Sequence, residues 1–341
     1  MQKMNSNSDI KEELASHYKG KNILITGGLG FIGSNLAIQL VSLEASITLL
    51  DNMDPDYGGN FFNIQTIKGQ VGVVNADIRN EQQIQKAVLG KDIIFHLAGQ
   101  VCHVMSLANP FPDIDINIKG TAILLEACRK YNPSAKIIFT GTRGQYGSSS
   151  KLPVSEIAPT HPRGIYEISN LTAEKIVQSY NDVHNIQGVM LRLTNIYGYR
   201  SQMKHSRYGV VNWFVRLGMD GEDIPVFGDG KIKRDFLFID DCIEAILLCG
   251  VNKNAIGEVI NVGHDQPQDF LQIVKTLQRI DSSVKWAFRP FSPERKAQEP
   301  GDFYSDISKI KKICHWTPKT PLLEGLKKTW DYYKKNKPHY W

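Results

Sequence analysis

The sequence predicts an α/β protein in which a doubly wound parallel sheet is followed by a smaller second lobe, also of the α/β class. Two observations predict this fold. Short apolar runs alternate with helical patterns through the first half of the 341 residues. Apolar strands placed between helices are typical of a parallel sheet whose two faces are both covered. The length fits two domains or one large one, at roughly 150 residues per domain.

The elements of the first half follow from these runs. Strands are predicted at 22–26, 47–50, 71–75, 92–97, 136–140 and 187–193. Helices are predicted at 31–43, 81–89, 113–131 and 165–184. Residues 1–19 form a polar N-terminal extension, in which we expect a short helix at 9–17.

The second half is less regular, because Gly and Pro interrupt it more often. Helices are predicted at 207–218, 240–250, 269–280 and 321–333, and short strands at 225–227, 258–262 and 285–287. We therefore place a first lobe at 20–193, with returns to it within 232–262, and a second lobe at 194–341. No low-complexity linker separates the lobes, so a cleft between them is the expected ligand site.

Composition excludes several classes of protein. The chain is 42% hydrophobic, which excludes a mainly disordered protein. No run reaches the ~18–20 apolar residues of a membrane span. The first twenty residues lack the apolar core of a signal peptide. The net charge of +5 suits a small anionic ligand and does not argue for nucleic acid. The nine histidines show no metal-ligand spacing, so no metal is expected.

The cysteines indicate a reducing compartment. They are five in number, widely scattered and without a C-x-x-C pair, so we expect reduced thiols and a cytoplasmic location. They are Cys102, Cys128, Cys242, Cys249 and Cys314.

A glycine-rich motif follows the first strand and opens the first helix. TGGLGFIG satisfies G-x-x-G-x-x-G through Gly27, Gly30 and Gly33. Glycines here permit a tight turn, and the helix N-terminus attracts a pyrophosphate. Asp51 ends the second strand near the ~20-residue offset of a carboxylate that holds the adenosine ribose, which favours NAD over NADP. The alternative is a structural turn with an unrelated aspartate.

The ends of the next two strands carry further candidates. Asp77 and Ile78 end the third strand, where a side chain can contact the adenine; the alternative is a helix N-cap for the segment from Asn80. Residues 97–99 end the fourth strand, where small side chains would let the dinucleotide pass; the alternative is plain packing.

A series of motifs then occurs in a fixed order. TGGLGFIG, Asp51 and Asp77-Ile78 are followed by HLAG at 96–99, GTRGQYG at 141–147, YEISN at 166–170, RLTNIYG at 192–198 and RDFLFIDD at 234–241. With these motifs the chain, from residue 21 to about residue 333, resembles the extended short-chain dehydrogenase/reductase superfamily in its NAD-dependent epimerase/dehydratase branch. HLAGQV at 96–101 and the run around 210–214 look most like nucleotide-sugar epimerases, of the UDP-glucose 4-epimerase and CDP-tyvelose 2-epimerase types.

The resemblance implies a Rossmann-type first lobe that binds NAD and a second lobe that binds a nucleotide-diphosphate sugar. It also implies a homodimer formed through the tyrosine helix and the helix before it. No nucleic-acid or membrane partner is expected. The expected cofactor contacts are Gly27, Gly30, Phe31, Ile32, Gly33, Asp51, Asn52, Asp77, Ile78, Leu97, Ala98, Gly99, Thr140, Tyr166 and Asn170.

The resemblance also implies catalytic roles. In the family a Ser or Thr, a Tyr and a Lys four residues later act on a sugar hydroxyl, and the matching positions are Thr142, Tyr166 and Asn170. Tyr166 is expected to take the hydroxyl proton as hydride leaves the same carbon, and Thr142 to bind the reacting oxygen. Tyr166 and Asn170 are one helical turn apart and so face the same ligand.

Asn170 departs from the family pattern, because it brings no charge to lower the pKa of Tyr166. A free phenol has a pKa of ~10, so about one in a thousand is ionised at pH 7, a deficit of ~4 kcal/mol. Arg143, directly after Thr142, is our hypothesis for an alternative activator. Two other readings stay open: Tyr166 is only a residue of an amphipathic helix, or the chain is an NAD-binding sensor with reduced catalysis.

The reaction is constrained by residues 143–144. Family dehydratases carry an Asp-Glu pair directly after the Thr, and decarboxylases a Glu; this chain has Arg143-Gly144. An epimerase needs no second acid or base at this place, so epimerisation through a keto-sugar is the leading prediction. A nucleotide-sugar dehydratase and a net dehydrogenase of the same family are the alternatives.

Most of the candidate substrate contacts have an alternative role. Arg234 is a candidate for the diphosphate or for an internal ion pair with Asp235, and Val211 and Phe227 are candidates for the base or for the core. His103 is either an extra acid or a polar lining residue. The expected substrate contacts are Gln100, His103, Arg143, Asn195, Val211, Phe227, Arg234 and Arg295.

Overall fold

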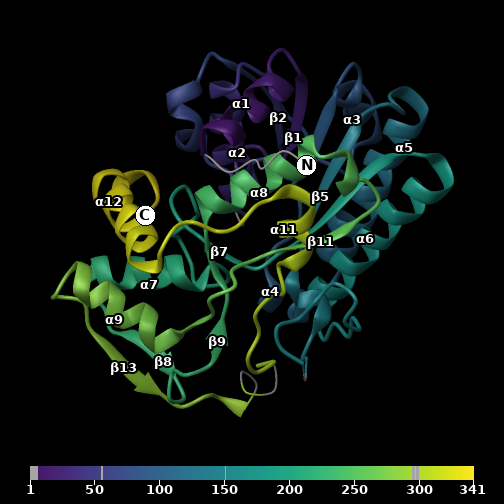
Figure 1. Cartoon of the computed structure of the whole chain (residues 1–341). Coiled ribbons are helices and arrows are strands. Elements are labelled where there is room, and N and C mark those ends of the chain that lie inside the picture. Colours follow the sequence, from purple (N-terminus) through teal and green to yellow (C-terminus); the bar gives the residue numbers. More distant parts are fainter. Residues whose placement is uncertain (1–6, 55–56, 150, 294–295, 297–298) are drawn as a thin grey trace.

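A seven-stranded parallel sheet forms the centre of the computed structural model, which describes residues 7–54, 57–149, 151–293, 296 and 299–341 (Figure 1). From one edge to the other its strands are β11 (Val259–Val262), β6 (Gln187–Leu193), β5 (Lys136–Thr142), β4 (Ile93–His96), β1 (Asn22–Thr26), β2 (Ser46–Asp51) and β3 (Val71–Asn75). The chain moves outward from β1 first in one direction and then in the other, which is the doubly wound order. The predicted fold class is therefore confirmed.

Helices cover both faces of this sheet. Successive residues of a strand point to opposite faces, so Ile23 and Ile25 of β1 pack on one side and Leu24 on the other. The first side is covered by α1 (Asn7–Tyr18), α2 (Phe31–Ser42) and α8 (Ile239–Val251). The second side is covered by α3 (Glu81–Val88), α5 (Gly120–Tyr131) and α6 (Ile165–His184).

The second lobe is built from three helices and short strand pairs. Its helices are α7 (Val210–Asp220), α9 (Phe270–Ile280) and α12 (Leu322–Asn336). Its strand pairs are β8 (Ile224–Phe227) with β13 (Trp286–Arg289), β9 (Lys233–Arg234) with β12 (Gln268–Asp269), and β7 (Asn195–Tyr197) with β10 (Phe236–Phe238). Phe214, Ile273 and Leu326 of the three helices belong to the same buried cluster as the first face of the sheet. The two lobes thus share one apolar core.

Most predicted elements lie within three residues of the observed ones, and the strands at 22–26, 71–75 and 187–193 coincide with them. The helix predicted at 113–131 is confirmed over Gly120–Tyr131, as α5, but the prediction of one regular α-helix is wrong for its first part. The segment opens as a π-helix, Asp113–Lys119, before α5 begins. Its Asp113 is fully buried and accepts a hydrogen bond from Gln100, so a tertiary contact overrides the regular α-helical spacing. The short helices α4 (His103–Ala108) and α11 (Ser308–Cys314) were not predicted.

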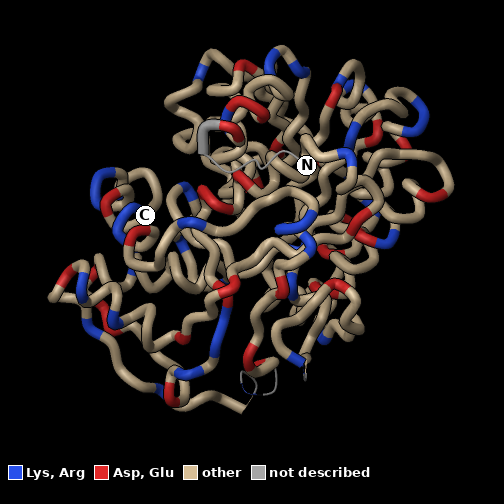
Figure 2. The backbone as a smooth tube through the Cα atoms, in the orientation of Figure 1, with Lys and Arg blue, Asp and Glu red and all other residues tan. Residues whose placement is uncertain are grey.

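The five cysteines are free and buried. Basic and acidic residues are interspersed over both lobes (Figure 2), as the small net charge predicts. Among the described residues, no helix combines the length and the apolar character that crossing a membrane requires.

Candidate active site

The loop between β1 and α2 is shaped for close contact between its backbone and a ligand. Gly27 has a φ of +69°, in the left-handed region that favours glycine. A Cβ at Gly33 would lie 2.2 Å from the carbonyl oxygen of Gly27, so a larger residue does not fit. Gly30 is the N-cap of α2, and no side chain caps the helix. The first N–H groups of α2 and the positive end of its dipole are therefore available to an anion.

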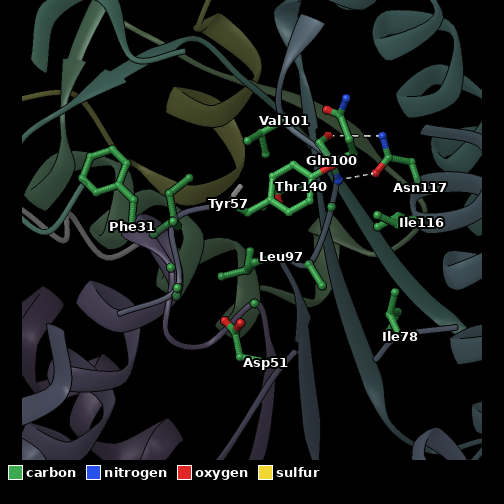
Figure 3. Close-up of a pocket in the computed structure, with 18 of the residues that line it drawn as sticks. Phe31, Asp51, Tyr57, Ile78, Leu97, Gln100, Val101, Ile116, Asn117 and Thr140 are labelled. Atoms are coloured by element: carbon green, nitrogen blue, oxygen red, sulfur yellow. Dashed lines mark hydrogen bonds between the residues drawn. The ribbon is translucent and has the colours of Figure 1, made fainter. Parts of the chain in front are cut away.

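A cavity of about 330 Å³ lies in front of this loop, where the parallel strands end (Figure 3). In a doubly wound sheet, ligands bind at this edge. All the residues predicted to contact the cofactor line the cavity, namely Gly27, Gly30, Phe31, Ile32, Gly33, Asp51, Asn52, Asp77, Ile78, Leu97, Ala98, Gly99, Thr140, Tyr166 and Asn170. The structure thus brings together residues from the glycine loop, the ends of four further strands and α6.

The two carboxylates of this set are held differently. Asp51 accepts the N–H groups of Leu29 and Met53, each at 3.0 Å, while burial raises the pKa of its carboxyl. Asp77 receives two hydrogen bonds from the Arg79 guanidinium, at 2.8 and 2.7 Å, which lower its pKa to about 2. Asp77 is not a helix N-cap, because Asn80 itself caps α3. Asp51 is thus fixed by the glycine loop that it faces.

Several lining residues were not predicted. The cavity is also lined by Tyr57, Gly58, Gly59, Asn117 and Tyr208. Asn117 accepts the N–H of Gln100 at 2.8 Å and donates to the Ser169 hydroxyl at 3.0 Å, so it ties the end of β4 to α6. The sequence carried no signal for Asn117, because it continues the alternation of polar and apolar residues over 113–119.

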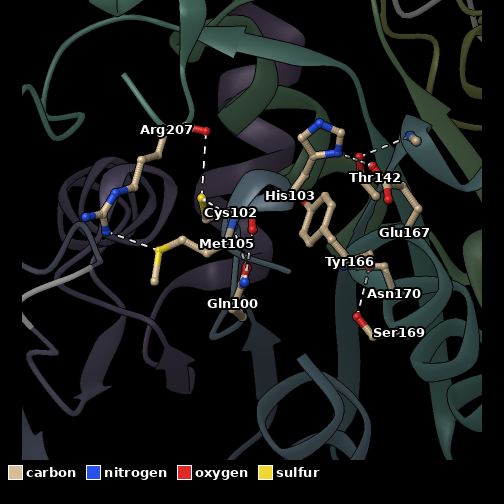
Figure 4. A network of polar contacts seen from close by, with 11 residues as sticks. Gln100, Cys102, His103, Met105, Thr142, Tyr166, Glu167, Ser169, Asn170 and Arg207 are labelled. Atoms are coloured by element: carbon tan, nitrogen blue, oxygen red, sulfur yellow. Dashed lines mark hydrogen bonds and ion pairs between the residues drawn. The ribbon is translucent and has the colours of Figure 1, made fainter. Parts of the chain in front are cut away.

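Thr142, Tyr166 and Asn170 meet at one end of the cavity (Figure 4). Thr142 ends β5, and its hydroxyl oxygen accepts the Gly144 N–H at 3.1 Å. Tyr166 lies in the first turn of α6, and Asn170 follows one turn later. The Asn170 amide donates to the carbonyl oxygen of Tyr166 at 2.9 Å, so part of its hydrogen-bonding capacity is used within the helix.

Burial raises the pKa of Tyr166 to about 12. The hydrogen bond with Thr142 and the charge of Arg143 oppose this shift, and the nearby carboxylates of Glu167 and Asp113 add to it. Arg143 is thus the cation that favours the phenolate, but it does not bring the pKa back to its ordinary value.

His103 and Glu167 form an ion pair beside this group. His103 Nδ1 lies 3.0 Å from Glu167 Oε1, and this hydrogen bond raises the pKa of the imidazole (Figure 4). His103 was predicted as a substrate contact, whereas Glu167 was not predicted for the site.

Gln100 lines the cavity, but its side chain is bound to the protein. Its amide donates to the carbonyl oxygen of Cys102 at 3.0 Å and to Asp113 at 3.1 Å. The thiol of Cys102 is buried and hydrogen-bonded to backbone groups of Met105 and Arg207. These contacts support a structural role for both residues.

Arg143 and Asn195 lie together next to Thr142. Arg143 Nε donates to Asn195 Oδ1 at 3.2 Å, and the guanidinium sits 4.9 Å from the ring centre of Phe303. Burial and the charge of Arg234 lower the pKa of Arg143 to about 10. The two arginines therefore approach each other near the reacting end of the cavity.

Arg234 is buried, and its guanidinium is engaged by the protein. It forms an ion pair with Glu299 and donates to the carbonyl oxygen of Lys233 at 2.8 Å. Asp235, the alternative partner, instead accepts from Thr194 and from the N–H of Ser305. The internal ion pair that was weighed against a diphosphate contact thus exists, with a different carboxylate.

The remaining substrate candidates do not gather at the cavity. Val211 is only 2% exposed and packs in the core, as its alternative stated. Phe227 packs against Phe291, with ring centres 5.7 Å apart. Arg295 lies outside the described residues.

The model of the NAD-dependent epimerase/dehydratase family matches residues 23–263. This match spans more than half of the chain and includes the glycine loop, the tyrosine helix and the strands between them. The chain belongs to this family. It is an enzyme of the NAD-dependent epimerase/dehydratase type, and NAD is its cofactor.

Relatives of known name match over nearly the whole chain. The putative UDP-glucose 4-epimerase of Methanocaldococcus jannaschii is 31% identical over 317 residues, which cover 92% of this chain and 99% of the relative. The UDP-glucose 4-epimerase of Thermotoga maritima, solved with UDP-glucose, is 30% identical with a TM-score of 0.84, over 92% and 99% of the two chains. The UDP-glucuronic acid 4-epimerase of Bacillus cereus, solved with UDP-glucuronic acid and NAD, is 30% identical with a TM-score of 0.82, over the same shares.

NAD fits the residues that this family member offers. A Cβ at Gly27 or Gly33 would collide with backbone atoms, so glycine keeps the loop tightly packed, and the uncapped start of α2 suits a pyrophosphate. At the other end of the dinucleotide, Tyr166 and Asn170 would meet the nicotinamide ribose.

Gly33→Ala is expected to weaken NAD binding at least about tenfold, because the new Cβ would collide with the carbonyl oxygen of Gly27 and open the loop. Titration calorimetry with NAD measures the effect. Gly72→Ala is the matched control, since a Cβ there would meet its nearest atom at an ordinary 3.7 Å. Equal affinities for Gly33→Ala and the wild type would show that the cofactor does not approach this loop.

Proposed function

We propose that the enzyme is a nucleotide-sugar epimerase, which oxidises a sugar carbinol to a ketone and restores the alcohol with opposite configuration. The observation that supports this is the position of Tyr166 and Thr142, which line the same cavity as the glycine loop. Tyr166 and Asn170 would hold the nicotinamide end of NAD, and the bound cofactor would supply the hydride acceptor and donor for the carbinol carbon. The names of the relatives support a sugar attached to a nucleotide diphosphate as the substrate.

Tyr166 moves the proton in this proposal. Its phenolate oxygen takes the hydroxyl proton as the carbon is oxidised, and it returns the same proton when the alcohol forms again. Thr142 holds the reacting oxygen. The Thr142 oxygen accepts the Gly144 N–H, and its hydroxyl is hydrogen-bonded to Tyr166, so a reacting oxygen placed beside Tyr166 would take over that hydrogen bond.

The proposal is tested with UDP-glucose and UDP-glucuronic acid as probes, in deuterated water, with the products read by proton NMR. A 4-epimer that retains hydrogen at the inverted carbon is the expected result, because the hydride never leaves the site. Deuterium at that carbon would contradict hydride return. Loss of water would favour the dehydratase alternative, and release of NADH the net dehydrogenase. No turnover of either sugar, with NAD bound, would favour the sensor.

Arg143→Ala is expected to move the pH–rate profile toward higher pH and to lower kcat at pH 7 about tenfold. Arg143 opposes the rise in the pKa of Tyr166, so its loss raises that pKa further and leaves less phenolate at neutral pH. Arg129→Ala, an arginine of α5 paired with Glu126, is the control and should leave the profile in place. An unchanged profile for Arg143→Ala would remove Arg143 as the activator.

We also propose that the enzyme is a cytoplasmic homodimer, paired through α5 and α6. Exposed apolar side chains on α6 support this, since Ile168 is 41% exposed and Val183 68%. A partner subunit would cover these two side chains, because apolar surface is buried where subunits meet.

A further inference from the structure

The ion pair of His103 and Glu167 is not used by the proposed hydride transfer, although it adjoins the reacting end of the cavity. Figure 4 shows both side chains next to Tyr166 and Thr142, and the charge of Glu167 acts on the pKa of Tyr166. The His103 side chain is 40% exposed and that of Glu167 14%. The pair therefore reaches from solvent to the group that holds the reacting oxygen.

Two glycines make room for the Glu167 side chain. A Cβ at Gly144 would lie 2.7 Å from Glu167 Cγ, and a Cβ at Gly164 would lie 2.4 Å from Glu167 Oε2. The Glu167 side chain thus fills, with its Cγ, the space that a side chain at position 144 would take, and its carboxyl oxygen Oε1 lies 3.5 Å from the same point. The absence of an acidic residue at 143–144 argued against a second acid or base, but α6 brings one to the same place.

In the described part of the chain, only one oxygen of this carboxylate is hydrogen-bonded. Glu167 Oε1 is bound to His103, whereas Oε2 is buried and accepts no hydrogen bond among the described residues. Buried side-chain polar atoms are mostly hydrogen-bonded, and an exception calls for an explanation, of which a catalytic role is one. His103 is the exchangeable partner, because its ring is hydrogen-bonded to Glu167 and partly open to solvent.

We infer that His103 and Glu167 form a second acid–base pair, which moves the proton on the carbon next to the one that Tyr166 oxidises. The inference rests on the proposed function, because only a ketone makes that neighbouring C–H bond acidic. Glu167 takes the proton, and the electrons of the C–H bond form a C=C bond as those of the carbonyl move to its oxygen. Thr142 and Tyr166 hydrogen-bond this enolate oxygen, and the electrons return when the carbon is protonated again.

No oxidant or reductant is consumed in this step. The proton that returns to the carbon comes from Glu167 after exchange with solvent through His103. In deuterated water, the carbon beside the ketone therefore gains deuterium. Hydride return introduces no deuterium at the oxidised carbon. Hydride transfer and proton exchange are therefore measured at different carbons of the same sugar.

The test supplies the ketone directly, so that it does not depend on hydride transfer. The NAD-loaded enzyme is incubated with UDP-4-keto-6-deoxy-glucose in deuterated water, and deuterium at the two carbons beside the ketone is measured by NMR and mass spectrometry. We expect the wild type to accelerate exchange over buffer. Glu167→Gln and His103→Gln should each lose that acceleration by roughly 10²-fold.

The matched control is Asp182→Asn, which removes an exposed carboxylate from the same helix and should exchange like the wild type. Melting temperature and NAD affinity show that each variant is folded. Exchange no faster than in buffer, or an unchanged rate in folded Glu167→Gln, would overturn the inference. Epimerisation of UDP-glucose is measured separately, and its failure would bear on the proposed function alone.

Discussion

Tyr166→Phe is expected to lower kcat by about 10³-fold, within the range that a positioned proton-transfer group contributes. The substitution removes only the hydroxyl, so the ring still packs beside Thr142 and the cavity keeps its shape. NAD affinity should change by no more than about twofold, because the glycine loop and Asp51 are untouched. Steady-state kinetics with the nucleotide sugar that the wild type converts, together with NAD titration, measure both quantities.

Tyr180→Phe is the matched control for this prediction. Tyr180 lies on the same helix, and its hydroxyl donates to Glu126 at 2.7 Å, away from the cavity. It should retain the wild-type kcat. If Tyr166→Phe also kept kcat within a few-fold, another group would be moving the hydroxyl proton, and Tyr166 would be a residue of the cavity wall.

The elements that carry the cofactor site could be predicted because their signals are local. The strand at 22–26 is a continuous apolar run, and the helix at 165–184 keeps its period over twenty residues. The glycine loop is marked by its own sequence, because Gly33 meets Gly27 within it, although Gly27 and Gly28 also lie against Ala98 and Leu49 of other segments. Because the loop directly follows the strand at 22–26, the sequence predicts that it lies at the end of that strand.

The pairs β7–β10 and β9–β12 could not be predicted, because each strand has two or three residues and its partner is distant in sequence. Such strands show no periodicity. The π-helical opening of 113–131 was missed for a related reason, since it depends on the burial of Asp113 against Gln100.

The substrate side was less predictable than the cofactor side for the same reason. The partner of Arg234 is Glu299, which lies 65 residues away in a segment without regular structure. The carboxyl of Glu167 occupies the space beside Gly144 from a different element. The residues directly after Thr142 in the sequence include no acid, so the sequence did not predict a carboxyl group beside Gly144. The packing of α6 against this segment brings Glu167 to that place.

Asn170→Lys is expected to raise kcat at pH 7 at least about tenfold and to move the pH–rate profile toward lower pH. With the pKa of Tyr166 at about 12 in the chain itself, only about one phenol in 10⁵ is ionised at pH 7. Asn170 is one helical turn away and 8% exposed. An ammonium group there would favour the phenolate and lower the pKa of Tyr166 by about 1–3 units.

The sign follows from the role of Tyr166 as a base. Below its pKa the rate rises with pH in proportion to the phenolate fraction, so a lower pKa brings the rise to lower pH. Asn170→Gln is the control, because it lengthens the side chain without adding charge and should leave the profile where it is. If the wild type is inert and Asn170→Lys gains turnover, the natural chain is an NAD-binding sensor. An unchanged profile in an active Asn170→Lys would mean that position 170 does not control the ionisation of Tyr166, and that the cation acting on the phenol lies elsewhere, with Arg143 the nearest candidate.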